Sequence, residues 1–194
     1  KCLDMTANPW LGELPAFQQM CDQDSIDDMI YFTQYTHARG LQYWIEYMRT
    51  HKGVCGGSLY WKFNDPVAPN RENMLFPSLM SVIDFYGMPK LAFDYARRAY
   101  EDVILAFREE EGKLLVFGCN ETLQAYTGEL CLYWMDHSGE KRLLARCQGT
   151  IEADCATQLA SWTPEAEAKP GAGYYKAVFT GDIALWNRFF PGDI

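Results

Sequence analysis

Basic residues are scarce in this sequence and form no block or stripe. The 194 residues include 17 Lys and Arg against 26 Asp and Glu, and the net charge is −9. Nucleic acids and anionic membrane surfaces both select basic patches, so neither is an expected partner. No apolar run approaches the ~18 residues that a membrane span requires, and Lys1 opens no signal-peptide pattern. These absences predict a globular protein whose partners are neither nucleic acid nor membrane.

Metal and redox motifs are also missing. The seven cysteines include no Cys-x-x-Cys pair, which excludes a zinc ribbon and a thioredoxin motif. The three histidines lack metal-ligand spacing, and His37 is expected to be a surface or packing residue. We therefore expect no metal and no cofactor. Free cysteines behave as small core residues and favour a cytoplasmic location, although a disulfide between two of the last four stays open.

The first hundred residues predict helices around one short strand, after an irregular connection over residues 1–24. Ser25, followed by Asp27 and Asp28, indicates a helix start. Helical periodicity then continues to Gly53, as one helix or as two joined near Gly40. A strand is predicted over 58–63 and a second helix over about 89–101. The polar side of the long helix carries Asp27, Gln34, Arg39, Glu46 and Arg49.

After about residue 102 the pattern changes to short alternating stretches separated by turn residues. Such strands predict an antiparallel sandwich of immunoglobulin type. The expected strands cover 103–107, 113–119, 129–135, 142–148, 157–162, 174–180 and 184–190, and the strand over 129–135 is apolar on both faces and so expected to be central. The exposed run Glu109–Glu111 is expected at a hairpin rim.

A single strand in the first hundred residues would leave its backbone groups unpaired. That region is better understood as the end of a larger α/β unit, with further polypeptide upstream. The unpaired strand edges also predict that residues 1–90 of the isolated chain pack either through self-association into a homo-oligomer or against a rearranged partner.

Two sequence runs resemble glycoside hydrolase family 2, and its β-mannosidase branch in particular. The first reads Gly-Ser-Leu-Tyr-Trp-Lys-Phe-Asn-Asp over 57–65. The second reads Ile-Asp-Phe-Tyr-Gly-Met-Pro-Lys over 83–90 and continues as Ala-Phe-Asp-Tyr-Ala-Arg-Arg over 92–98. Lys62 and Phe85 stand where the family usually has Gln and Tyr, and residues 66–69 interrupt its usual Trp-Pro. Further stretches similar to the family are Gln34 with Leu41, Glu46 and Arg49, then 116–120, 128–130 and 187–190.

The resemblance implies α/β plus all-β architecture: a terminal piece of a TIM barrel followed by an immunoglobulin-like β-sandwich. Residues 1–102 would be the C-terminal part of the barrel (helix seven, strand eight and helix eight), and 103–194 the sandwich. Active sites of such barrels lie at the C-terminal ends of the strands. Trp61 would then be the aromatic platform under the sugar, and Asn64 and Asp65 would shape the loop at the mouth. The implied substrate is a carbohydrate, a terminal β-mannoside or a related β-glycoside.

The two carboxyl groups that a retaining glycosidase needs, about 5–5.5 Å apart, are not recognisable here. The family's Asn-Glu and Ser-Glu-Phe-Gly motifs do not occur. Glu13 lies in Gly-Glu-Leu-Pro, a loop-like setting that makes it a poor nucleophile candidate. We expect a C-terminal fragment of a retaining β-glycosidase that is inactive alone and needs the N-terminal part of its parent polypeptide as partner.

Two other functions are compatible with the sequence. The sandwich could be a non-catalytic module that binds carbohydrate or protein, which an exposed line of aromatic residues on one sheet face would favour. Tyr174, Tyr175 and Trp186 are the candidates for that line. The sandwich could also be a spacer without a ligand. Trp44 and Trp134 lie on periodic apolar faces and are expected in the core.

Overall fold

The computed structural model describes residues 25–66, 80–164 and 172–191. They form two compact units, which we describe one at a time. The first unit holds 25–44, 59–66 and 80–100, and the second holds 45–58, 101–164 and 172–191. The connection expected over 1–24, with Glu13, lies outside the described residues. No helix in the described part of the chain is both long and apolar enough to cross a membrane.

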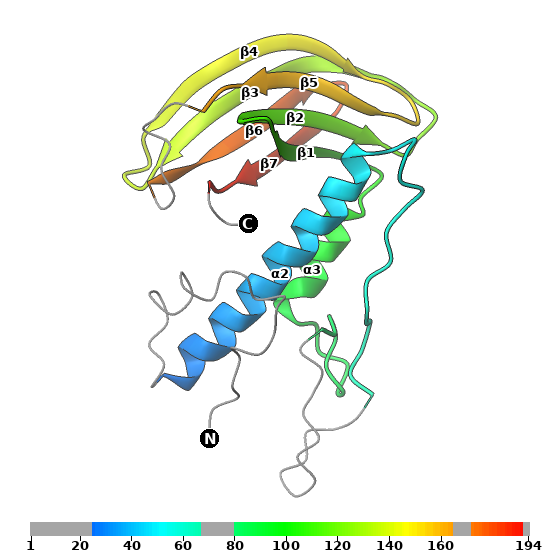
Figure 1. Ribbon diagram of the computed structural model, residues 1–194, viewed down its shortest axis with the longest axis vertical. Coiled ribbons are helices and arrows are strands. Elements are labelled where there is room, and N and C mark those ends of the chain that lie inside the picture. Colours follow the sequence, from blue (N-terminus) through cyan, green and yellow to red (C-terminus); the bar gives the residue numbers. More distant parts are fainter. Residues whose placement is uncertain (1–24, 67–79, 165–171, 192–194) are drawn as a thin grey trace, which may run out of the picture. The chain divides into compact units, whose positions relative to one another are not determined.

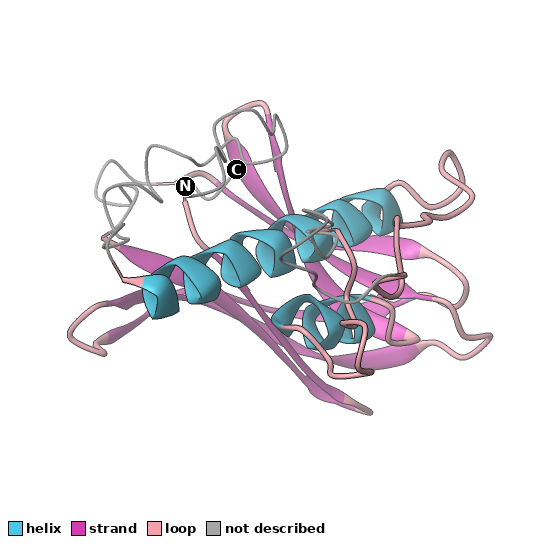
Figure 2. Ribbon diagram, turned by 90° about the horizontal axis from the view of Figure 1, so that it is seen from below, coloured by secondary structure: helices cyan, strands magenta, loops and turns pink. Residues whose placement is uncertain are grey.

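Helix α2 (Ile26–Thr50) is a single helix of 25 residues, which settles the choice between one helix and two (Figures 1 and 2). Its start is as predicted: the Asp28 amide donates to Ser25 Oγ at 3.3 Å. Asp27 and Asp28 in the first turn and Arg49 in the last turn complement the helix dipole. At the other end the Thr50 hydroxyl donates to the Tyr47 carbonyl at 2.7 Å, and the helix ends there.

Gly40 lies inside α2, and its replacement by alanine is expected to stabilise the protein. A Cβ built at Gly40 meets no atom within 4 Å. A glycine in a helix interior costs about 0.5–1 kcal/mol relative to alanine. We expect Gly40→Ala to raise the free energy of unfolding by about that amount, measured by urea unfolding followed by helical circular dichroism.

Gly118→Ala provides the contrast to that variant. A Cβ at Gly118 would lie 2.6 Å from Ile151 Cγ1, so this change is expected to destabilise. If Gly40→Ala also destabilised the protein, Gly40 would have a role that its open surroundings do not reveal.

The first unit packs around small residues. Three small side chains are fully buried there: Ala38 of α2, Val82 of the stretch before α3, and Ala92 of α3 (Leu91–Ala99). Lys90 precedes α3 without a side-chain cap. Instead Gln34 Oε1 accepts a hydrogen bond from the Leu91 amide at 3.0 Å. Gln34, predicted on the solvent-facing side of α2, therefore caps the neighbouring helix.

The strand predicted over 58–63 is not present. This segment contacts one neighbouring stretch, over residues 80–83, through hydrogen bonds such as Val82 N to Phe63 O at 3.1 Å and Asp65 N to Ile83 O at 3.0 Å. They leave one isolated parallel bridge, Asn64 with Ile83. A strand needs a continuous ladder along a neighbour, and the described residues supply none here.

All seven strands predicted for the second half are confirmed. They form two antiparallel sheets, β1-β2-β5 and β4-β3-β6-β7 (Figure 1). In the constant-type immunoglobulin sandwich the fourth strand joins the first sheet, whereas β4 here pairs with β3 in the second sheet. The strands are β1 Val103–Glu110, β2 Lys113–Asn120, β3 Tyr126–Asp136, β4 Lys141–Ile151, β5 Ala156–Trp162, β6 Gly173–Gly181 and β7 Ala184–Phe189.

Alternating residues of both sheets build the sandwich core. Strand β3 lies between β4 and β6, so its predicted central position is confirmed. Leu130 and Leu132 of β3 are buried against Phe179 and Tyr175 of β6. Trp134 packs against this core as predicted, with its ring centroid 4.9 Å from that of Tyr175.

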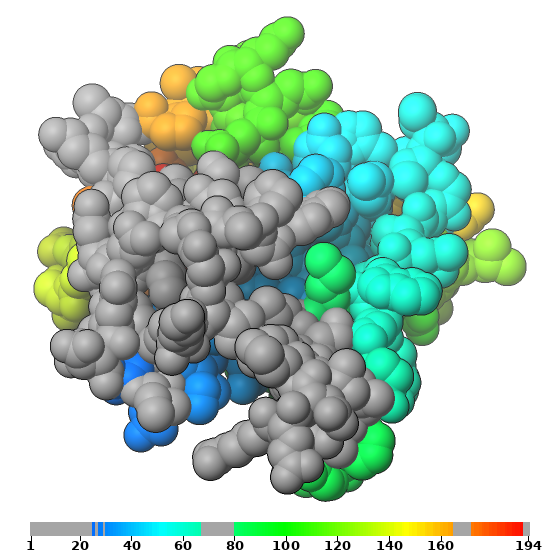
Figure 3. Space-filling view, turned by 60° about the horizontal axis from the view of Figure 1, so that its bottom comes forward, coloured from blue at the N-terminus to red at the C-terminus, as the bar shows by residue number. Residues whose placement is uncertain are grey.

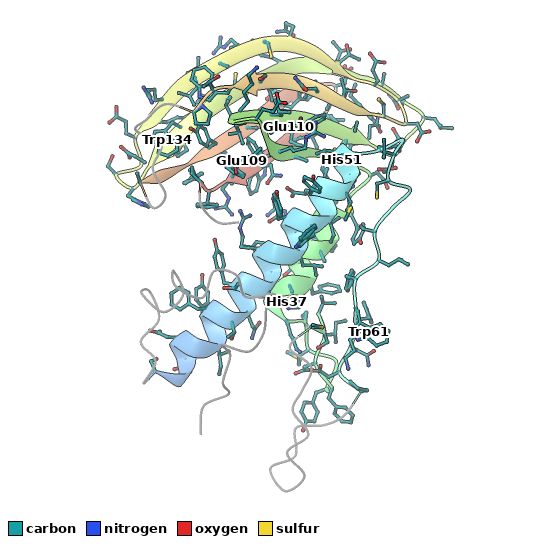
Figure 4. All side chains as sticks on the ribbon, in the orientation of Figure 1. His37, His51, Trp61, Glu109, Glu110 and Trp134 are labelled. Carbon is teal, nitrogen blue, oxygen red and sulfur yellow. The ribbon has the colours of Figure 1, made fainter. Side chains whose placement is uncertain are left out.

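The hairpin turns follow their predicted chemistry. Between β3 and β4, Asp136 Oδ1 accepts hydrogen bonds from the Ser138 hydroxyl at 2.7 Å and from the Glu140 amide at 2.9 Å. These donors lower the pKa of Asp136, the Ser138 hydroxyl most strongly. Between β1 and β2, residues 109–111 are exposed, and Figure 4 labels Glu109 and Glu110 among them. Glu111 and Gly112 have positive φ values of 50° and 73°. The expected solvated rim is confirmed.

The last turns of α2 belong to the sandwich unit, which the sequence did not predict. Glu46, expected on the exposed face, is only 8% exposed. Its Oε2 accepts a hydrogen bond from Asn187 Nδ2 at 3.0 Å, and the same Asn187 nitrogen donates to the Leu105 carbonyl at 2.7 Å. Glu46 and Asn187 are 141 residues apart in the chain, and their hydrogen bond joins the end of α2 to β7. The bond from Asn187 to Leu105 continues this link to β1.

Basic residues at the end of α2 bind acidic groups of the same unit. Arg49 Nε forms an ion pair with Glu121 Oε1 at 3.5 Å, and its Nη1 donates to the Glu101 backbone carbonyl at 2.7 Å. Lys52 Nζ forms ion pairs with Asp154 Oδ1 at 2.7 Å and with Glu121. Nearby, Cys119 is fully buried in a second cluster on β1 and β2, and burial raises its pKa to about 12. The acidic side chains at this end of the helix, Glu121 and Asp154, are thus neutralised by Arg49 and Lys52.

One single-residue expectation is corrected, and one open alternative is settled. Trp44 is 50% exposed and is not a core residue, because the buried side of α2 at this point presents Ile45 and Gln42 instead. The cysteines of the described residues are all free, so the last four form no disulfide. The residues Asn120-Glu121-Thr122 match the short glycosylation pattern, which is common by chance, and Asn120 is fully buried. Its Nδ2 donates to the carbonyls of Gln124 and Glu152, and its Oδ1 accepts from Thr122.

Candidate functional site

The three predicted site residues lie on one extended segment of the first unit. Trp61 is 78% exposed, and Phe63 two residues later is also exposed. The peptide bond between Trp61 and Lys62 is cis. Figure 4 shows Trp61 on this segment, and in Figure 3 the segment lies on the surface in cyan to turquoise. The indole of Trp61 is therefore accessible to a ligand.

Asp65 anchors this segment through its buried side chain. Its side chain is fully buried, and its Oδ2 lies 2.9 Å from Lys90 Nζ. The Ser81 hydroxyl donates to Asp65 Oδ1, and Lys90 Nζ contacts Ser81 Oγ at 2.6 Å. A buried carboxylate needs such a paired and hydrogen-bonded setting. Asp65 therefore fixes the end of the segment through charge and does not present its carboxylate to solvent.

Asn64 differs from its neighbour in being exposed. Its backbone forms the bridge with Ile83, and its Nδ2 donates to the Asp65 carbonyl at 3.4 Å. Trp61 and Asn64 thus present side chains at the surface, while Asp65 holds the backbone that carries them.

A second loop adjoins this segment and was missed by sequence reasoning. Asp84 Oδ1 accepts hydrogen bonds from the amides of Tyr86 at 2.9 Å and Met88 at 2.8 Å, and Gly87 has a φ of +84°. The resulting turn leaves Tyr86 71% and Met88 63% exposed. The signal was present in the sequence, because an Asp followed by Gly three residues later is typical of such side-chain-stabilised turns.

The described side chains at this site include exposed aromatic rings and the Asn64 amide. In the described ranges no group of three or more His, Cys, Asp or Glu residues could hold a metal ion. His37, on α2, is half-buried as a packing residue, and burial followed by the charge of Lys90 lowers its pKa. The exposed aromatic rings and the Asn64 amide can contact a ligand's apolar and hydroxyl groups.

No protein-family model matches the sequence, and no curated protein matches it significantly. Solved structures do match. The β-D-mannosidase of Dictyoglomus thermophilum is 24% identical with a TM-score of 0.71, over 86% of this chain and 20% of that chain. The exo-chitosanase of Amycolatopsis orientalis is 17% identical with a TM-score of 0.67, over 84% and 19%. A second structure of that same protein, CsxA, described as an exo-β-D-glucosaminidase, is 16% identical with a TM-score of 0.71, over 93% and 21%.

This chain spans about a fifth of the length of each of these structures. At such identities the likeness concerns the fold. The chain therefore has the fold of a segment of these glycosidases, and its resemblance to glycoside hydrolase family 2 is confirmed as a likeness of fold.

Proposed function

We propose that the chain is the C-terminal part of a retaining β-glycosidase that hydrolyses terminal β-mannosides or related β-glycosides. The observation that carries the proposal is the accessible Trp61 on a segment anchored through Asp65, in a chain with the fold of a β-mannosidase segment. In this proposal residues 1–102 complete a TIM barrel, and residues 103–194 form a supporting sandwich.

Each site residue has a distinct role in the proposal. Trp61 is the platform on which the apolar face of the sugar ring rests, because aromatic faces suit C–H surfaces. Asn64 contacts a sugar hydroxyl through its amide. Asp65 is a positioning residue: its pairing with Lys90 holds the backbone that presents the other two.

The catalytic carboxylates belong, in this proposal, to the part of the parent polypeptide that precedes the chain. The exposed apolar side chains of the first unit support this, since large exposed apolar groups mark interaction sites. Six of these side chains lie on two segments joined by the hydrogen bonds of Phe63. They are Leu59, Trp61, Phe63, Phe85, Tyr86 and Met88.

The test uses the longest polypeptide encoded by the reading frame that contains this chain. We expect it to hydrolyse a nitrophenyl β-D-mannoside, and we expect the chain alone to be inactive. Trp61→Ala is expected to lower kcat/KM by roughly tenfold or more, because it removes the stacking surface. Trp44→Ala is the matched control: it removes a half-exposed indole of α2 and should leave kcat/KM within about twofold. Equal effects of the two variants would refute the role of Trp61.

A second candidate function, a binding module formed by the sandwich, is favoured by one observation. Aromatic side chains do gather on one face of the four-stranded sheet, although Tyr175 is not among them. Tyr175 is 2% exposed in the core, whereas Trp186 is 45% exposed. The candidates Tyr174 and Trp186 thus remain, and Tyr133 joins them.

A further inference from the structure

The outer face of the sheet β4-β3-β6-β7 carries a row of cations. Side chains directly opposite each other in a ladder share one face. Tyr133 of β3 pairs with Lys176 of β6, and Lys176 pairs with Arg188 of β7. Adjacent strands are about 4.8 Å apart, so Lys176 and Arg188 stand side by side across the strands. Lys141 of β4 reaches the same row, with its Nζ 3.8 Å from the centre of the Tyr133 ring.

Aromatic rings support these cations. The guanidinium of Arg188 lies 5.4 Å from the Trp186 ring centroid and 6.0 Å from that of Phe190. Lys176 Nζ lies 5.8 Å from the Trp186 ring. A cation over a ring face is held by the ring quadrupole while its outward N–H groups stay available as donors. The row is thus a preorganised set of donors on an apolar base.

The charge of this face is opposite to that of the chain. A fourth cation, Arg146, stands opposite Cys131 on the same face, and its side chain is 59% exposed. Among the paired residues of these strands, the acidic residue on this face is Glu129, and its Oε1 lies 3.7 Å from Arg146 Nε. The whole chain has a net charge of −9. A cationic face on an acidic protein selects a ligand that carries negative charge.

We propose that this outer face, defined by Tyr133, Lys141, Arg146, Lys176, Trp186 and Arg188, binds a carboxylate-bearing oligosaccharide, a short chain of uronic acid residues. The proposal deepens the second candidate function and does not depend on the Trp61 site. Each cation donates to a sugar carboxylate, with Arg188 suited to a bidentate pair. The edges of the rings contact the apolar parts of the sugar.

The same observations disfavour two other negatively charged partners, an acidic protein and a single-stranded nucleic acid. Lysine is depleted from the cores of protein interfaces, and here Lys176 stands in the middle of the row. Single-stranded nucleic acid binds such sheets by stacking bases on open ring faces, but Lys141 covers Tyr133, and Arg188 and Lys176 lie over Trp186. A hydrated, flexible acidic sugar chain fits both constraints.

The experiment titrates the chain with tetragalacturonate by isothermal calorimetry. Three probes are compared with it: the carboxyl-reduced neutral tetramer, hexaglutamate and a short single-stranded oligonucleotide. We expect binding of the uronate tetramer that weakens at least about fivefold between 50 and 250 mM salt. The double variant Lys176→Glu with Arg188→Glu is expected to weaken it by at least about tenfold. Lys113→Glu, at the exposed start of β2 on the other sheet, is the control and should change it by less than about twofold.

Each outcome decides the matter. Equal binding of the neutral tetramer would overturn the role of the carboxylates, and tighter binding of hexaglutamate or the oligonucleotide would replace the sugar by that class of partner. No binding of any probe, or a double variant that binds like the control while keeping its melting temperature, would also overturn the proposal. None of these results bears on the mannosidase assay of Trp61→Ala, so the two functions fail separately.

Discussion

Replacement of Leu132 by alanine is expected to lower the free energy of unfolding of the sandwich by about 3–4 kcal/mol. Leu132 is fully buried in the middle of the core. Its neighbours in the adjacent strands are Ala145 and Ala177. These small side chains cannot move into the space that the missing leucine atoms leave, so the cavity stays open and the full penalty applies. Urea unfolding followed by the β-sheet circular dichroism signal measures the effect.

Leu123→Ala is the matched control, because the same atoms are removed from a side chain that is 90% exposed. Its effect should stay within about 0.5 kcal/mol. A loss below about 1 kcal/mol for Leu132→Ala would contradict the packing described here and would mean that the core rearranges around the cavity.

Asp65→Asn is expected to release the segment that carries Trp61. The change keeps the shape of the side chain but removes the charge that faces Lys90 Nζ at 2.9 Å. Breaking one side of a buried ion pair costs about 3 kcal/mol, which corresponds to amide exchange roughly 100-fold faster. Hydrogen exchange at Asp65 N and Ile83 N, which both bond across the two segments, reports the release directly.

The control for that experiment is Asp94→Asn on α3. Asp94 pairs with Arg97 at 3.7 Å, and both side chains are more than half exposed. Such a surface pair contributes less than about 1 kcal/mol, so exchange at the two reporting amides should be unchanged. If Asp65→Asn left those amides protected as well, the backbone alone would hold the segment, and Asp65 would not be a positioning residue.

Local patterns in the sequence were sufficient for the strands and helices that have regular surroundings. The apolar residues on both faces of 129–135 predicted a central strand, and the turn residues Asp136–Gly139 predicted the hairpin that follows it. The hairpin was confirmed because its turn depends on residues close together in the chain, and the central strand was confirmed because it has a sheet neighbour on each side. The exposure of Trp61 agrees with its predicted platform role, which stays a proposal.

Long-range pairings were beyond such reasoning. Glu46 reads as an exposed polar residue of an amphipathic helix until Asn187, 141 residues later, is placed beside it. Gln34 caps α3 from 57 residues away. The strand expected over 58–63 failed for the opposite reason: its composition favours a strand, but a strand also needs neighbours, and composition does not reveal whether they exist.

The buried position of Asn120 limits how this protein can be produced. Oligosaccharide transfer acts on Asn-x-Thr sequences in extended, unfolded chains, and Asn120-Glu121-Thr122 would be an acceptor in a host that performs it. A glycan on Asn120 Nδ2 would replace one of the two N–H groups that donate to Gln124 and Glu152, and the fully buried side chain leaves no room for a sugar. Modified chains would then be unable to complete the sandwich, so a bacterial cytoplasm is the better production host, and Asn120 cannot be used for attaching a sugar tag.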